Sequence, residues 1–154
     1  MDRELLETYG KGIIATTGCP PSGEVARLLQ QGDFDAACQS ASDYRDIFGK
    51  DNFFCELMDH GIDIEKRVQE DLFALKKKLD LPGLATNDLH YTYADDTKSH
   101  EVLLCVQTGK TMSDPNRFKF DAQDFYLKSA AEMRAQWDPI HPEACDNTLL
   151  IAER

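Results

Sequence analysis

The chain has 154 residues, of which 42% are hydrophobic, so it is long and apolar enough to form one ordinary domain with a real core. Its formal net charge of −11 argues against an autonomous nucleic-acid-binding domain, because such domains neutralise phosphates with a basic face. The same charge does not exclude a domain within a larger DNA enzyme, and an acidic cavity would attract metal ions.

No window of the sequence reaches the ~18 consecutive apolar residues that a membrane span needs. The N-terminus has neither the basic nor the apolar region of a signal peptide, so we expect a soluble, cytosolic protein with no membrane partner. The five cysteines are odd in number and include no Cys-x-x-Cys pair, which argues against a disulfide framework or a zinc ribbon. We expect buried thiols, with Cys19 as the exception.

Short apolar strands alternate with helices through the first part of the chain. Strands are expected over residues 12–17, 52–58 and 83–87. Helices are expected over 2–9, from Val25 to Gly32 with Ser22 as the N-cap, over 33–48, and after Gly61 along a stripe that ends at Leu79. The order strand–helix–helix–strand–helix–strand predicts a parallel β/α architecture, in an open sheet or a barrel, with its chemistry in loops at the carboxyl ends of the strands.

Beyond Tyr93 the pattern predicts a mainly helical connection. A helix is expected over 95–107, an extended segment over 125–127, and a helix capped by Ser129 with Glu132 three residues later. A last helix is expected from about Pro142 to Arg154. We therefore divide the chain into 1–94 and 95–154.

Asp88 and His90 follow the third predicted strand and are two residues apart. In an extended segment that spacing points both side chains to one face, where a carboxylate and an imidazole form half of a divalent-metal site. Cys19 follows the first strand and could add a thiolate. The competing interpretation is that Asp88 belongs to a turn, that His90 is an ordinary loop residue, and that Cys19 is a small buried thiol.

Four other residues have side chains that could bind a metal. His60 also follows a strand, although a histidine before a glycine usually belongs to a turn. Glu56 lies within a strand, where we expect it to pair with a core or interface cation. His100, on a helix, and His141, between prolines, are not expected to be ligands. Because a catalytic zinc usually has three protein ligands and an open position, the residues alone predict an incomplete Asp/His/Cys metal site.

Several segments resemble bacterial replicative DNA polymerase III alpha subunits, most closely the type found in high-GC Gram-positive bacteria. They are residues 12–20, 22–25, 43–49, 56–61, 85–91, 103–110, 114–120, 125–129 and 147–154. The resemblance implies a polymerase-and-histidinol-phosphatase (PHP) domain, a distorted TIM-like β/α barrel with parallel strands, followed here by a mainly helical linker. It also implies a cluster of divalent metal ions, zinc first and manganese or magnesium as alternatives, that hydrolyses the 3′ end of DNA in proofreading. The matching ligand positions are Cys19, Asp88 and His90.

The resemblance also implies partners: DNA, other replisome subunits and the rest of the alpha subunit. The opening His-x-His motif of the family would precede Met1 and the palm aspartates would follow Arg154, so we expect the second half of a PHP barrel. Expressed by itself, it should be unstable or self-associate, and it should have weak or no nuclease activity. Pro21 is one proline more than the family loop has, and we expect it to shift that loop. The alternatives are a non-catalytic scaffold or interaction remnant, and a stand-alone PHP phosphoesterase, which the segments after residue 94 disfavour.

Overall fold

The computed structural model describes residues 2–20 and 22–154, so the expected effect of Pro21 lies outside the described residues. The elements are α1 (Arg3–Tyr9), β1 (Ala15–Thr16), α2 (Glu24–Gln30), α3 (Phe34–Phe48), η1 (Lys50–Asn52), β2 (Phe53–Leu57), α4 (Asp63–Leu79), β3 (Gly83–Ala85), η2 (Ala94–Asp96), α5 (Thr97–Thr108), α6 (Ala130–Trp137) and α7 (Pro142–Ala152). The predicted order of strands and helices is confirmed. Within the described ranges, no helix is long and apolar enough to cross a membrane.

The three strands form one parallel sheet in the order β1-β2-β3. Ala15 pairs with Phe53 at one edge of β2, and Cys55 pairs with Gly83 at the other. Parallel neighbours need a crossover connection, which α2 with α3 supplies before β2 and α4 supplies before β3. All three carboxyl ends therefore lie at the same end of the sheet, as the sequence predicts for a β/α fold.

The core lies between the sheet and the helices. Phe53, Cys55 and Leu57 of β2 belong to one buried cluster with Ala37 and Ala41 of α3 and with further side chains of α2, α4, α6 and α7. Because side chains alternate along a strand, Phe54 and Glu56 point to the opposite face of the sheet. That face is where the polar groups of the strand ends are found. As expected, Cys38, Cys55, Cys105 and Cys145 are buried, and Cys19 is half-buried.

The loop after β1 is held by close backbone contacts. A Cβ atom on Gly23 would lie 2.8 Å from the carbonyl oxygen of Thr17 and 2.9 Å from that of Cys19, so only glycine fits there. Gly23, not the predicted Ser22, is the N-cap of α2, and no side chain caps the helix. The hydroxyl of Ser22 instead lies 3.0 Å from the Cys19 sulfur.

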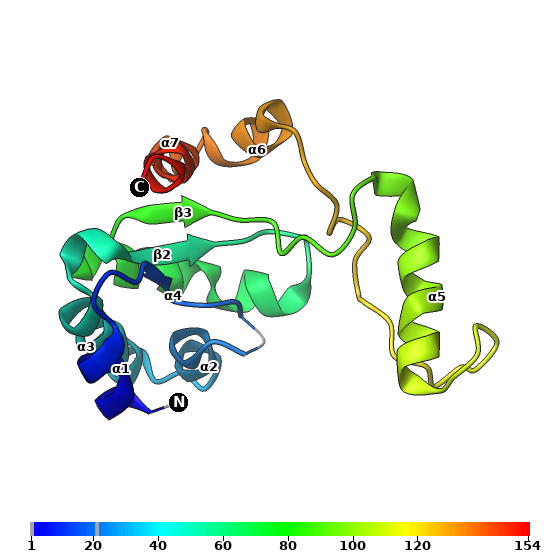
Figure 1. Ribbon diagram of the computed structural model, residues 1–154, viewed down its shortest axis with the longest axis horizontal. Helices are drawn as coiled ribbons and strands as arrows, with labels where there is room; N and C mark the ends of the chain where they lie inside the picture. Colours follow the sequence, from blue (N-terminus) through cyan, green and yellow to red (C-terminus); the bar gives the residue numbers. More distant parts are fainter. Residues whose placement is uncertain (1, 21) are drawn as a thin grey trace.

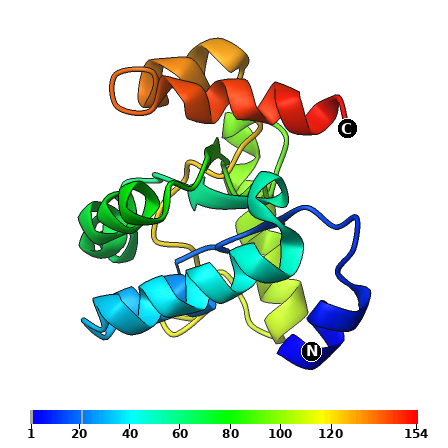
Figure 2. The same ribbon diagram turned by 90° about the vertical axis from the view of Figure 1, so that its left-hand side faces the viewer.

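The last helix, α7, packs on β3 and against α6, and both helices lie at the opposite side of the molecule from α1 (Figures 1 and 2). Ser129 and Glu132 form the predicted capping box of α6, and Trp137 at its end is 1% exposed. Asn147 of α7 donates a 2.7 Å hydrogen bond to the carbonyl oxygen of Gly83 in β3. In contrast, α5 stands apart from the sheet (Figure 1). The division of the chain at residue 94 stays a prediction.

Candidate functional site

Cys19 and Asp88 follow β1 and β3, so parallel pairing with β2 brings their loops to one end of the sheet. The carbonyl oxygen of Cys19 accepts hydrogen bonds from the backbone N–H groups of Ser22 and Gly23, at 3.3 and 2.8 Å. This turn holds the thiol at the start of α2, with the Ser22 hydroxyl as its polar neighbour. The sequence placed Cys19 correctly at a strand end.

Asp88 does not continue β3 as an extended residue. Its φ of 40° lies in the left-handed region, so the expectation of an extended segment with both side chains on one face is wrong in its geometry. The turn nevertheless brings the pair together in another way. The Nδ1 atom of His90 lies 2.6 Å from the carbonyl oxygen of Asp88 and 3.9 Å from its carboxylate. An N–H at Nδ1 that donates to this carbonyl leaves Nε2 as the nitrogen available to accept a hydrogen bond or bind a metal.

These three side chains line a common cavity of about 470 Å³. The other lining residues are Pro20, Met58, Ile62, Glu65, Phe118, Lys119, Phe120, Asp121 and Phe125. The cavity thus joins a thiol, a carboxylate and an imidazole from two strand-end loops with an aromatic wall from residues 118–125. We take this cavity as the candidate functional site.

The aromatic wall and His100 are features that sequence analysis missed. The His90 ring lies 4.7 Å from the ring of Phe120 and 5.6 Å from that of Phe125, both edge-on. His100 of α5, not expected near a site, lies 5.6 Å from the His90 ring. Burial and the neighbouring His90 together lower the pKa of His100. No local pattern in the sequence indicates that residues 118–125 return to this loop.

His60 is fully engaged inside the fold. Its Nδ1 lies 2.6 Å from a carboxylate oxygen of Glu65, and its Nε2 lies 2.9 Å from the carbonyl oxygen of Asn87. Both partners can accept hydrogen bonds, an arrangement that favours the doubly protonated imidazolium form of the ring. Burial lowers the pKa of His60, but the hydrogen bonds to Glu65 and Asn87 outweigh it and raise the pKa above its usual value. We therefore assign His60 a structural role.

Glu56 pairs with hydroxyl groups and not with the expected cation. Its carboxylate accepts hydrogen bonds from Thr16 of β1 at 2.6 Å and from Thr86, just after β3, at 2.9 Å. The side chain lies on the sheet face opposite the helical core, because it alternates with the buried Cys55 and Leu57. Glu56 thus joins all three strands near their carboxyl ends.

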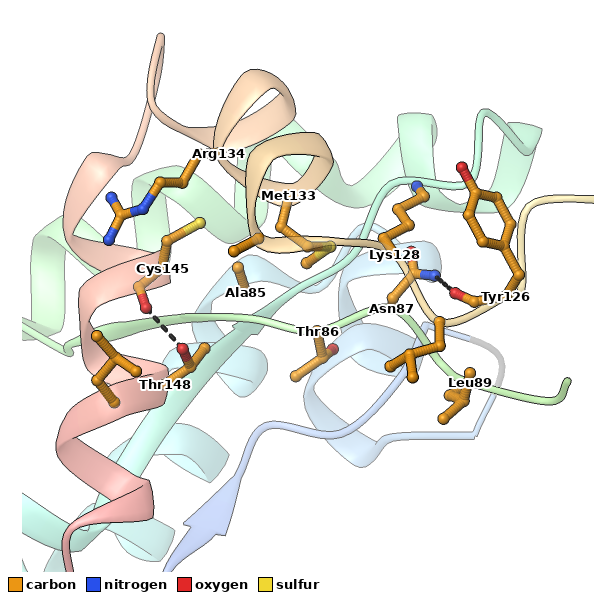
Figure 3. A pocket seen from close by; sticks show the side chains of 13 residues that line it. Ala85, Thr86, Asn87, Leu89, Tyr126, Lys128, Met133, Arg134, Cys145 and Thr148 are labelled. Carbon is orange, nitrogen blue, oxygen red and sulfur yellow. Dashed lines mark hydrogen bonds between the residues drawn. The ribbon is translucent and has the colours of Figure 1, made fainter. Parts of the chain in front are cut away.

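The loop that carries the site is fastened to the chain after α5. Asn87 donates to the carbonyl oxygens of Asp124 and Tyr126, at 3.2 and 2.6 Å, and the second bond is drawn in Figure 3. The N–H of His90 donates to the carbonyl oxygen of Phe125 at 2.9 Å. Tyr91 and Tyr126 form an isolated parallel bridge. The extended segment predicted at 125–127 therefore exists as a partner of residues 87–91, which we call the ligand loop because two of the predicted ligands lie in it.

A second hollow of about 360 Å³ lies on the other side of Asn87, between the β3 end and the helices α6 and α7 (Figure 3). Its walls are mainly apolar, with Leu89, Leu127 and Met133 among them. Its two cations, Lys128 and Arg134, are paired with Asp124 and Asp146. None of the predicted ligands lines it.

The donor chemistry of the first cavity fits a divalent metal, since thiolate, imidazole and carboxylate are the ligands that zinc takes. The arrangement supplies only part of a coordination shell. Among residues 2–20 and 22–154, no three His, Cys, Asp or Glu side chains lie close enough together to hold a metal ion. Cys19, Asp88 and His90 are thus candidate ligands that share a cavity without converging on one point.

Sequence comparisons show which known proteins this chain is similar to. Residues 1–60 match the PHP domain, which is consistent with a partial TIM-like barrel. Over 154 residues the chain is 62% identical to the DNA polymerase III subunit alpha of Saccharopolyspora erythraea, 60% to that of Mycobacterium leprae and 58% to that of Mycobacterium tuberculosis. Each alignment covers the whole of this chain, which corresponds to 13% of the length of the relative. Over its whole length the chain is therefore similar to one segment of these DNA polymerase III alpha subunits, and its residues 1–60 carry the PHP match.

Proposed function

We propose that this chain is part of a replicative DNA polymerase III alpha subunit and that its PHP region contributes to a metal-dependent 3′–5′ proofreading exonuclease. In this proposal the whole protein synthesises DNA in the cytoplasm, together with other replisome subunits. Cys19, Asp88 and His90 supply part of the metal shell, and the rest of the alpha subunit supplies the remaining ligands.

The observation that carries the proposal is the shared cavity of Cys19, Asp88 and His90 at the carboxyl end of a parallel sheet. In parallel β/α folds this is the end that binds substrates. Lys119 also lines the cavity, and it is an exposed cation suited to a phosphate group. Because the chain is acidic, we expect other parts of the protein to hold the nucleic acid while this site takes part in its hydrolysis.

The chemistry of each residue follows from its contacts. A divalent metal held by Cys19, Asp88, His90 and ligands from the rest of the protein would lower the pKa of water and so supply a nucleophile at neutral pH. The carbonyl oxygen of Asp88 fixes the tautomer and orientation of His90, so that Nε2 faces away from it. The aromatic side chains of Phe120 and Phe125 restrict the rotation of the His90 ring and exclude water from one side of it.

The test is hydrolysis of a primer with a mismatched 3′ end by the full-length alpha subunit that contains this segment. We expect Asp88→Asn and His90→Ala each to lower hydrolysis by about 100-fold or more, since loss of a ligand should exceed the 10–100-fold typical of outer-shell changes. Primer extension should persist in both variants, which shows that the protein is folded.

Matched controls are Asp35→Asn, an exposed carboxylate on α3, and His141→Ala, which lies against Phe73 far along the chain from the ligand loop. Both should hydrolyse the primer at the wild-type rate. Wild-type hydrolysis in Asp88→Asn and His90→Ala would remove these residues from the mechanism. A wild-type protein that binds the metal and does not hydrolyse the primer would favour the non-catalytic scaffold, the alternative that the incomplete ligand set supports.

A further inference from the structure

The carboxylate of Glu56 is the centre of a hydrogen-bonded row that crosses the whole sheet. Thr16 of β1 donates to one of its oxygens at 2.6 Å, and Thr86 after β3 donates to the other at 2.9 Å. Both donors are short, β-branched side chains with few rotamers, so the row fixes the lateral spacing of the strands. Backbone pairing alone holds only two residue pairs between β1 and β2.

Each end of this row leads directly into a loop of the candidate site. Thr16 precedes Thr17, Gly18 and Cys19, and its hydroxyl also accepts a hydrogen bond from the N–H of Gly18 at 3.3 Å. The hydroxyl of Thr17 accepts one from the N–H of Glu56 at 3.0 Å. On the other side, Thr86 stands two residues before Asp88. The Glu56 carboxylate is therefore connected to the start of the Cys19 loop and to the start of the Asp88 loop.

The contacts of Glu56 do not fit a role as an ion-pair partner. In the described part of the chain, no Lys, Arg or His nitrogen lies within 4.0 Å of its carboxylate. A half-buried carboxylate without a cation is usually held in place by hydroxyl or amide donors, and here both donors come from neighbouring strands. The hydrogen bonds of Glu56 therefore fix the positions of neighbouring strands and do not neutralise a cation.

We propose that Glu56 is a positioning residue, which sets the separation of the Cys19 loop from the Asp88 loop through Thr16 and Thr86. This inference rests on the proposed function, because those loops matter as carriers of metal ligands. It assigns Glu56 no contact with metal or substrate. Outer-shell groups that orient ligands in this way contribute strongly to metal affinity.

The experiment uses Co²⁺, added to the metal-free full-length alpha subunit as a spectroscopic substitute for zinc. The Cys19 signal is the thiolate-to-cobalt charge-transfer absorption of the wild type minus that of Cys19→Ser. We expect Glu56→Ala to weaken Co²⁺ binding by about tenfold or more, and Thr16→Val and Thr86→Val each to weaken it by less. Glu56→Gln should stay close to wild type, because a glutamine can still accept from one threonine and donate to the other.

The second measurement needs no metal: the rate at which iodoacetamide alkylates Cys19, followed by mass spectrometry of its peptide. Loss of the row should loosen the Cys19 loop, so the rate should rise in Glu56→Ala and Thr16→Val. The matched control is Glu24→Ala, which removes a carboxylate with three donors, Tyr44, Ser40 and Arg3, at the joint of α1, α2 and α3. Glu24→Ala should lower the melting temperature without changing either the cobalt signal or the alkylation rate.

The proposal is overturned if Glu56→Ala alters neither measurement, or if Glu24→Ala alters them equally, which would make the effect one of general stability. It is also overturned if Glu56→Gln binds Co²⁺ as poorly as Glu56→Ala while both threonine variants bind normally, because that pattern identifies a direct ligand. A wild-type protein with no Cys19-dependent cobalt signal would contradict the proposed metal site. The alkylation rates would then still decide the role of Glu56.

Discussion

The buried pair of His60 and Glu65 shows how one residue connects two loops. Both side chains are nearly inaccessible, at 1% and 4% exposed, and Glu65 also accepts a hydrogen bond from the N–H of His60 at 2.6 Å. On the other side of the ring, Nε2 is hydrogen-bonded to the carbonyl oxygen of Asn87, and the ring stacks on that of Phe125 with 4.3 Å between the centroids. The His60 ring is therefore part of the support beneath the ligand loop.

This pair predicts a pH-dependent stability. The folded state raises the pKa of His60 above 6.5, so the stabilisation is fully present below that value and is lost as the pH rises through the folded pKa. Of the charged neighbours, Glu65 favours the imidazolium and Lys128 opposes it. We expect the free energy of unfolding to fall above about pH 6.5, with a slope of up to about 1.4 kcal/mol per pH unit.

Urea unfolding of the dilute chain across this pH range measures the effect. The control is the double variant His60→Gln with Glu65→Gln, which keeps two polar side chains and removes both charges. Its stability should vary less with pH than that of the wild type. Parallel pH profiles for the two proteins would show that His60 does not titrate as the structure indicates.

At the scale of elements, the ligand loop after β3 pairs with residues 124–127. Asn87 is the side chain that makes this pairing, through its bonds to Asp124 and Tyr126. We expect Asn87→Ala to leave those carbonyl oxygens without a donor, which costs roughly 1–3 kcal/mol. Backbone amides of residues 125–127 should then exchange with solvent faster, as measured by hydrogen–deuterium exchange with mass spectrometry.

Asn147→Ala is the matched control, since Asn147 makes one bond of the same kind to Gly83 on the far side of β3. It should speed exchange in α7 and leave residues 125–127 unchanged. Equal exchange of 125–127 in the wild type and Asn87→Ala would mean that the backbone bonds of His90 and Tyr91 to Phe125 hold the segment without Asn87.

The sequence predicted the elements well wherever periodicity carries the information. The apolar stripe of α4 and the capping box at Ser129 are local patterns, and both are confirmed. The return of residues 118–125 to His90 depends on contacts between segments far apart in the chain, and the approach of His100 depends on the path of the chain from the loop into α5. Periodicity encodes neither. The prediction that Asp88 and His90 share one face of an extended segment is wrong for a further reason. The left-handed backbone of Asp88 breaks the alternation of side chains on which that prediction depends.

The whole molecule combines high negative charge with exposed apolar surface. Leu103 and Val106, one turn apart on α5, are 65% and 75% exposed, and Leu127 and Leu149 are each 61% exposed. Within the described residues, β1 and β3 each pair with β2 alone, so both have an outer edge. Apolar surface and strand edges favour association, while a net charge of −11 opposes it by repulsion.

This balance predicts that the isolated chain self-associates and that salt strengthens the association. Surface repulsion is screened beyond about 8 Å at 0.15 M ionic strength, whereas apolar contacts are not weakened by salt. Light scattering during size-exclusion chromatography should therefore give a mass above 17.4 kDa that increases with salt. Val106→Glu together with Leu103→Glu should reduce that mass if α5 takes part, because the two residues share one face of the helix. A monodisperse monomer with a sharp cooperative melt at every salt concentration would show that the exposed apolar side chains and strand edges do not drive association.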